Sequence, residues 1–245
     1  MNKIKVLLTG ASGMVGSNLL EHPYAEKFNI LTPSRQELNL LDSKSIKIYL
    51  NHHQPDIVIH AAGKVGGVQA NLNEPVSYLM DNLDMGRNIV WGSRQAGIRR
   101  LINLGSSCMY PRNYSKPLSE DMVLKAELEP TNEGYALAKI VTARLCEYIA
   151  REDSSYQYKT LIPCNLYGRH DKFNTEHSHL LPAIIYKMHQ AIKAGQKIVE
   201  IWGDGTARRE FMYAADLADA LIRGITHFET LPSYMNVGMG SDFTI

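Results

Sequence analysis

The 245-residue sequence is poor in cysteine, with only Cys108, Cys146 and Cys164. Their number is odd, and their spacing does not match that of a metal-binding knuckle. This argues against a disulfide framework and against a structural zinc site. We therefore expect a protein of a reducing compartment, the cytoplasm, with no bound metal.

The sequence also lacks an excess of charge, a long apolar run and internal repeats. The 26 Lys and Arg residues nearly balance the 25 Asp and Glu residues, so no overall field attracts nucleic acid or an anionic membrane. The first apolar run ends at Thr9 and Gly10, and no stretch approaches the roughly 18 apolar residues of a membrane span. We expect a soluble globular protein in which a local site binds any anionic ligand.

Short apolar runs alternate with stretches of helical periodicity along most of the chain. The strand-length runs are residues 4–9, 28–32, 56–62, 99–107 and 158–166, and we expect helices over 15–21, 42–51, 76–96, 135–151 and 181–194. Continuous apolar runs of this length suit strands that are buried on both faces. The alternation predicts an α/β fold with a Rossmann-like, doubly wound parallel sheet.

The composition changes after about residue 166, where His, Asn and Gly become frequent. We interpret this change as the start of a smaller lobe that covers a ligand. "FMYAADLADALIRGI" then resumes the strand-to-helix pattern, with Asp216 in the first helical turn. The sequence thus predicts a nucleotide-binding domain over 1–165, resumed at about 211–239, and a substrate-binding lobe over 166–210 and 240–245.

A glycine-rich turn follows the first predicted strand, in "VLLTGASGMVGSNLL". Gly10 would permit the tight turn, Gly13 would let the backbone approach a pyrophosphate, and Gly16 would allow the helix to pack closely on the strand. Three spaced glycines alone could serve an ordinary turn. Their place between a strand and a helix favours a dinucleotide-binding site.

The end of the second predicted strand bears on the choice between the two nicotinamide cofactors. An acidic residue there binds the ribose 2′-hydroxyl group, whereas a basic residue accommodates a 2′-phosphate. The chain reads "LTPSRQELN", with Ser34 and Arg35 at this place and Glu37 close by. This favours NADP, and the alternative is that Arg35 is a solvated surface charge.

Tyr135 and Lys139 stand four residues apart in "EGYALAK", so on a helix they share one face. A tyrosine with a pKa near 10 needs a neighbouring cation if it is to exchange a proton with a carbonyl group at neutral pH. Ser106 and Ser107, at the end of a predicted strand, could hydrogen-bond the reacting oxygen, and Ser106 is our first choice. Such a Tyr and Lys pair usually lies on a solvated helix face. Together with the glycine-rich turn and the serines at the strand end, it predicts a carbonyl reductase.

The glycine turn, "LGSSCMYP" and "EPTNEGYALAK" resemble the extended short-chain dehydrogenase/reductase superfamily. Within it, "AAGKVGG", "NLYGRHDKFN", "SHLLPAI" and "WGDGTARREFMYAADLADA" are similar to the GDP-L-fucose synthase family, from Lys5 to the last residue. The resemblance implies NADPH-dependent 3,5-epimerisation and 4-reduction of GDP-4-keto-6-deoxy-D-mannose. This family continues beyond "SDFTI", so the lobe would be incomplete here and would lack an acidic substrate contact.

The resemblance also implies roles for individual residues. Cys108 would be the base and His179 the acid of epimerisation, although a cysteine after a strand is more often a packing residue and His179 could be an ordinary histidine of the lobe. Sugar-nucleotide contacts would come from Lys187, Trp202 and Arg209. Cofactor contacts would come from Gly10, Ala11, Ser12, Gly13, Met14, Val15, Gly16, Arg35, Ala61, Ala62, Leu104, Gly105, Ser106, Ser107, Lys139, Pro163, Cys164, Asn165, Leu166 and His179.

Three further expectations complete the sequence-based hypothesis. The family pattern implies a homodimer through the helices over 76–96 and 135–151, although burial inside one subunit explains their apolar residues equally well. A related GDP-linked 4-keto deoxy sugar or heptose is an alternative substrate, with or without epimerisation. A non-catalytic NADP-sensing protein of the same fold is the alternative outside enzymology.

Overall fold

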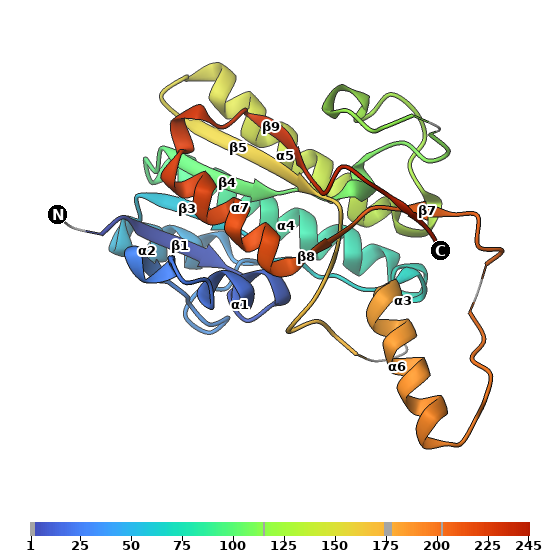
Figure 1. The fold of residues 1–245 in the computed structure, drawn as a ribbon. Helices are drawn as coiled ribbons and strands as arrows, with labels where there is room; N and C mark the ends of the chain where they lie inside the picture. Colours follow the sequence, from blue (N-terminus) through green and yellow to red (C-terminus); the bar gives the residue numbers. More distant parts are fainter. Residues whose placement is uncertain (1–2, 115, 174–177, 202) are drawn as a thin grey trace.

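The computed structural model describes residues 3–114, 116–173, 178–201 and 203–245. At its centre lies a six-stranded sheet in the order β2-β1-β3-β4-β5-β9, with every neighbouring pair parallel (Figure 1). The strands are β1 (Lys5–Thr9), β2 (Asn29–Leu31), β3 (Ile57–His60), β4 (Arg100–Leu104), β5 (Gln157–Pro163) and β9 (Tyr234–Val237). The predicted α/β fold with a doubly wound parallel sheet is confirmed.

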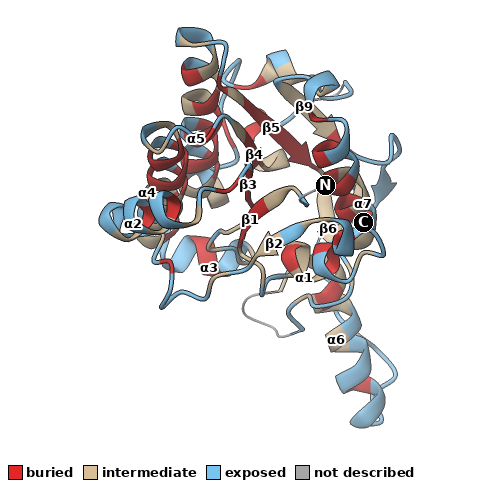
Figure 2. Cartoon of the chain, turned by 90° about the vertical axis from the view of Figure 1, so that its left-hand side faces the viewer, coloured by how far each residue is buried: buried red, intermediate tan, exposed pale blue. Residues whose placement is uncertain are grey.

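Helices cover both faces of this sheet, as the burial-coloured view shows (Figure 2). One face packs against α2 (Ser43–His53), α4 (Pro75–Gln95) and α5 (Glu133–Glu152), and the other against α1 (Met14–Leu20) and α7 (Ala214–Thr226). Outside these layers lie α3 (Val68–Asn73) and α6 (Leu180–Lys193). Short 3-10 turns occur at Ala25–Lys27, Ser107–Met109, Glu120–Met122, Pro130–Asn132 and Phe228–Thr230.

Alternation along β1 shows why the central strands read as continuous apolar runs. Val6 and Leu8 belong to the core under α1 and α7, whereas Leu7, between them, belongs to the core under α2, α4 and α5. All three side chains are fully buried. A strand covered on both faces has no solvent side, so polar residues do not alternate with apolar ones.

The structure divides the expected strand over 158–166 into two. β5 remains in the central sheet, and after Cys164 the short β6 (Asn165–Tyr167) pairs instead with β8 (Phe211–Tyr213). The backbone N–H of Asn165 donates to the Glu210 carbonyl at 3.2 Å, which directs the chain into the second sheet. A third sheet joins β7 (Arg208–Arg209) to β10 (Phe243–Thr244) in antiparallel fashion.

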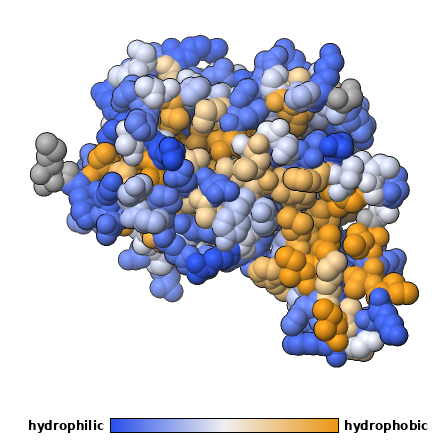
Figure 3. Space-filling view, in the orientation of Figure 1, coloured by the Kyte–Doolittle hydropathy of each residue, from blue (hydrophilic) through white to orange (hydrophobic). Residues whose placement is uncertain are grey.

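α6 projects away from the body of the molecule (Figure 1). Apolar side chains gather over this helix and the chain beside it, as the hydropathy view shows (Figure 3). They include Ile185, Met188, Ile192, Ile198 and Ile201, and Ile192 is 77% exposed. Among the described helices, none combines the length and apolar character needed to cross a membrane.

Candidate active site

The glycine-rich turn lies where β1 leads into α1. Gly10 has φ of +74°, and a Cβ atom on it would lie 2.7 Å from the backbone nitrogen of Ala62. A Cβ on Gly16 would lie 2.3 Å from the Gly10 carbonyl oxygen. Only glycine therefore allows the turn, α1 and the segment after β3 to approach so closely. Ala11, Ser12, Gly13, Met14 and Val15 lie in this turn and at the start of α1.

A buried hydroxyl group ties the end of β1 to the segment after β3. Thr9 Oγ1 lies 2.9 Å from His60 Nδ1, and the N–H of Ala62 donates to the same oxygen at 3.3 Å. Burial, and then the charge of Lys139, lower the pKa of His60 to about 3. The Thr9 hydroxyl group, which also bonds the neutral His60 imidazole, thus holds Ala62 beside the glycine turn.

In the loop after β2, the acidic Glu37 and the basic Arg35 do not form an ion pair with each other. Glu37 Oε2 accepts a hydrogen bond from the backbone N–H of Ser34 at 2.8 Å, and this bond lowers the pKa of the Glu37 carboxyl. Arg35 is exposed and forms no ion pair with any residue that the structure describes. The carboxylate is engaged within its own loop, while the guanidinium group is available to an anion.

Ser106, Tyr135 and Lys139 come together where β4 ends. Lys139 is 7% exposed, its Nζ donates to the Leu104 carbonyl at 2.9 Å, and Nζ lies 5.8 Å from the centre of the Tyr135 ring. The Ser106 hydroxyl hydrogen-bonds Tyr135. The helical spacing of Tyr135 and Lys139 on α5 and the end of β4 therefore bring the three predicted residues into one cluster.

The protonation state of this cluster differs from the sequence-based expectation that Lys139 favours a phenolate. Burial, and then the nearby Cys108, raise the pKa of Tyr135 well above its usual value, and the Ser106 hydrogen bond opposes this only in part. Burial lowers the pKa of Lys139 to about 8. Removal from water is the largest effect on the Tyr135 pKa, so the resting side chain is a phenol. A phenol is the form that donates a proton to a carbonyl oxygen.

Cys108 lies next to this cluster, on the 3-10 turn after β4. Its Sγ accepts a hydrogen bond from Asn132 Nδ2 at 3.2 Å, and its backbone N–H donates to Ser106 Oγ at 3.3 Å. Burial raises the pKa of the thiol, whereas the hydrogen bonds from Ser106 and Asn132 and the charge of Arg209 lower it. Asn132 carries no predicted role, because an asparagine before a helix is ordinarily an N-cap.

His179 immediately precedes α6. The surrounding protein lowers the pKa of its imidazole, and the charge of Asp171 raises it. Asp171, like Asn132, carries no predicted role. Its Oδ2 is buried without a hydrogen-bond partner among the described residues. Ser178 Oγ donates to the Lys172 carbonyl at 2.5 Å, and this bond ties the segment of Asp171 to that of His179.

The described residues among the expected sugar-nucleotide contacts lie on α6 and β7, outside the central sheet and its helix layers. Lys187, on α6, donates from Nζ to the Glu200 carbonyl at 3.3 Å. Arg209, on β7, is exposed, and its charge acts on Cys108. Trp202 lies outside the described residues.

The other expected cofactor residues lie at two strand ends. Leu104 and Gly105 end β4 and precede Ser106 and Ser107. Pro163, Cys164, Asn165 and Leu166 link β5 to β6, and burial, followed by the charge of Glu210, raises the pKa of Cys164 to about 11. Parallel strands end at one edge of a sheet, so these segments face the same side as the glycine turn.

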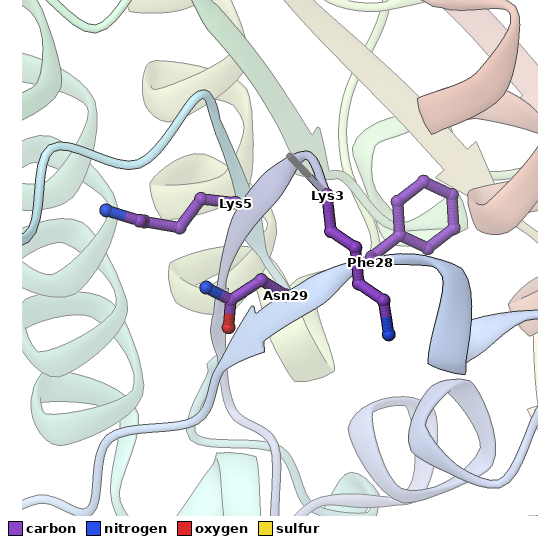
Figure 4. Close-up of a pocket in the computed structure, with 4 residues that line it drawn as sticks. All are labelled: Lys3, Lys5, Phe28 and Asn29. Carbon is purple, nitrogen blue, oxygen red and sulfur yellow. The ribbon is translucent and has the colours of Figure 1, made fainter. Parts of the chain in front are cut away.

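A shallow pocket lies at the opposite edge, lined by Lys3, Lys5, Phe28 and Asn29 (Figure 4). These residues are at or near the starts of β1 and β2. Lys5 Nζ donates to the His53 carbonyl at 2.8 Å. The pocket shares no residue with the Ser106, Tyr135 and Lys139 cluster, so we assign it no part in the chemistry.

Comparison with known proteins identifies the family. Residues 6–238 match the model of the NAD-dependent epimerase/dehydratase family. The chain belongs to this family. The protein is therefore an NAD(P)-dependent enzyme, which sets aside the non-catalytic alternative. The predicted extended short-chain dehydrogenase/reductase superfamily is confirmed.

Similar proteins share most of this chain. It is 57% identical over 242 residues to the GDP-L-colitose synthase of Yersinia pseudotuberculosis, covering 99% of this chain and 79% of the relative. It is 47% identical to the GDP-L-fucose synthase of Azorhizobium caulinodans, covering 98% and 77%. The solved GDP-mannoheptose C4 reductase of Campylobacter jejuni, with NADP bound, aligns with a TM-score of 0.87 at 27% identity, covering 100% and 82%.

Proposed function

We propose that the protein catalyses the NADPH-dependent 3,5-epimerisation and 4-reduction of GDP-4-keto-6-deoxy-D-mannose to GDP-L-fucose. The observation that carries this proposal is the cluster where β4 ends, in which Tyr135 and Lys139 lie beside Cys108. A proton donor for reduction and a group for proton abstraction thus share one place. The names of the similar proteins support a GDP-linked sugar as substrate.

The residues around the glycine turn fit NADPH. A Cβ atom on Gly13 would meet only the Gly10 carbonyl oxygen, at 3.3 Å. The space beside the Gly13 backbone is therefore open to a pyrophosphate. Arg35 offers a charge to a 2′-phosphate, and the NADP of the C. jejuni structure supports this choice. When bound, NADPH would supply the hydride for C4, and the Lys139 ammonium would hold its ribose.

Reduction needs a proton on O4 as the carbonyl carbon accepts hydride. Tyr135 rests as a phenol and can give that proton, and Ser106 can hydrogen-bond the same oxygen. The Lys139 ammonium group stabilises the phenolate that the transfer leaves behind. A positioned acid of this kind contributes about 10²–10⁴-fold to a rate.

Epimerisation uses the acidity that the 4-keto group gives to the protons on C3 and C5. Cys108 would remove a proton from one face of the ring, and His179 would return one to the other face. Lys187 and Arg209 would bind the diphosphate. The thiol must first lose its own proton, since burial favours its neutral form.

A 3-deoxy substrate is the second candidate, favoured by the 57% identity to a GDP-L-colitose synthase. Colitose lacks the 3-hydroxyl group of fucose, so only C5 has to be inverted. The corresponding 4-keto-3,6-dideoxy sugar should then be turned over with a higher kcat/KM than the 3-hydroxy sugar. A GDP-linked heptose reductase is the remaining alternative and requires no inversion.

One experiment separates these reactions. Purified protein is mixed with NADPH and each GDP-4-keto sugar in deuterated water, and the product is analysed by NMR. Deuterium at both C3 and C5 of GDP-L-fucose is the expected result. NADPH oxidation without deuterium incorporation would leave only the reductase, and no turnover of either sugar would refute the proposal.

We also propose a homodimer through α4 and α5. Large apolar side chains on these helices remain exposed in one subunit, including Met80, Trp91, Val141 and Tyr148. Burial within the subunit therefore does not explain them. Light scattering should give twice the mass of one chain, and Trp91→Glu should reduce it to the mass of one chain.

A further inference from the structure

Asn132 occupies the N-cap position of α5 but does not cap the helix. An asparagine at this position usually accepts a hydrogen bond from a backbone N–H of the first turn. The Asn132 side chain accepts none. Its amide instead reaches the 3-10 turn after β4, where Nδ2 donates to Cys108 Sγ at 3.2 Å.

The other end of the same amide is unsatisfied. Asn132 Oδ1 is buried and has no hydrogen-bond partner among the residues that the structure describes. Buried polar atoms are nearly always hydrogen-bonded in folded proteins, so an orphaned acceptor beside a reactive sulfur indicates a bound group that supplies the donor. A sugar ring over Cys108 carries hydroxyl groups next to its acidic carbons.

We propose that Asn132 is the positioning residue of the epimerisation, with Nδ2 holding Cys108 Sγ as a thiolate while Oδ1 accepts a hydrogen bond from a sugar hydroxyl group. This inference rests on the proposed function and deepens it. One amide would thereby align the base and the ring that it deprotonates.

The proton balance explains why the amide matters. The thiolate takes a proton from carbon and becomes a thiol, the C–H electrons form the enediolate, and His179 returns a proton to the opposite face to restore the ketone. An N–H donor is bound more strongly by the thiolate than by the thiol. Around Cys108, the groups that titrate or carry charge are Tyr135, Lys139 and Arg209, and Arg209 acts in the same direction as Asn132.

Asn132→Leu removes both ends of the amide and keeps the branched shape and the number of side-chain heavy atoms. Alkylation of Cys108 by iodoacetamide, followed by mass spectrometry of its peptide across pH, should require a pH about one unit higher, which means about tenfold slower alkylation at a given pH. Solvent deuterium incorporation should slow by a similar factor, and the KM for the GDP-sugar should rise. The Kd for NADPH should stay unchanged.

Two further variants keep this test decisive. Asn132→Asp keeps a good helix N-cap but replaces the donor with a negative charge, so Cys108 alkylation should move to still higher pH. Glu133→Gln is the matched control, because Glu133 is the residue after Asn132 and is exposed. This variant should behave as the unchanged protein.

The possible results distinguish this inference from the proposed function. If Cys108→Ser retains deuterium incorporation, Cys108 is not the base and the proposed function needs revision. If Cys108→Ser abolishes incorporation while both Asn132 variants alkylate and exchange like the unchanged protein, Asn132 has no such role. A change in the Kd for NADPH without a change in the KM for the sugar would assign Oδ1 to the cofactor and overturn its sugar contact.

Discussion

The sheet edge where β4 ends and the outlying α6 segment hold their functional side chains differently. Lys139 is buried and hydrogen-bonded to the backbone of β4, and Cys108 is held by Asn132. By contrast, Arg209 is exposed on β7, and α6 carries apolar side chains on its surface. The proposed base Cys108 and the lysine that serves Tyr135 are thus held by the body of the protein, whereas the proposed sugar-nucleotide contacts lie on elements with little support from it.

The largest expected effect comes from the cluster where β4 ends. Tyr135→Phe removes the acid that gives O4 its proton, so kcat for NADPH oxidation should fall by about 10³-fold. The Kd for NADPH, measured by fluorescence titration, should change less than about twofold, because the ring and Lys139 remain. Unchanged turnover would remove Tyr135 from the mechanism.

The pH dependence of stability should differ between variants of a buried histidine and of an exposed one. His60, with a pKa of about 3 in the fold and 6.5 as its usual value, binds its proton first in the unfolded chain. Its contribution to stability is therefore present above pH 6.5 and is lost as the pH falls towards 3. His60→Asn should lose about 3 kcal/mol less on acidification from about pH 7 to about pH 4.

Chemical denaturation at each pH measures this difference. His189→Asn, at an exposed position on α6, should show the pH dependence of the unchanged protein. Equal acid sensitivity of the His60 variant and the unchanged protein would contradict a neutral buried imidazole.

Two glycines test packing in the two regions. Gly10 and Gly195 both have positive φ, of +74° and +66°, but a Cβ would clash at Gly10 and meet nothing within 4 Å at Gly195. Gly195→Ala should lower the free energy of unfolding by about 1 kcal/mol, from backbone strain alone. Gly10→Ala should lower it by about 2–3 kcal/mol, because overpacking adds to the strain. Equal losses would mean that the turn relaxes.

The smallest effect is expected at the exposed contacts. Arg209→Ala should raise the KM for the GDP-sugar about tenfold through the loss of a charged diphosphate contact, with the Kd for NADPH unchanged. Because the Arg209 charge also acts on Cys108, its loss should slow alkylation of the thiol slightly. A KM equal to that of the unchanged protein would exclude Arg209 from the sugar site.

Local patterns predicted the elements that carry strong periodicity. The expected helix over 135–151 corresponds to α5, and the helix over 76–96 to α4. α3 and β9 were missed, because a six-residue helix and a four-residue strand give too few repeats to reveal a period. The break at Cys164 was missed as well, since the apolar run continues through it while the hydrogen-bond partner changes from β9 to β8.

Sequence by itself determined the parallel sheet, the glycine turn and the pairing of Tyr135 with Lys139, because each follows from a local pattern. These patterns are continuous apolar runs that alternate with helical stretches, a turn that needs glycine, and one helical turn between the phenol and the amine. Only the tertiary structure decided that Asn132 turns from its helix to Cys108 and that burial keeps Tyr135 protonated. Both depend on groups that are distant along the chain and on the water that folding excludes, which no local pattern records.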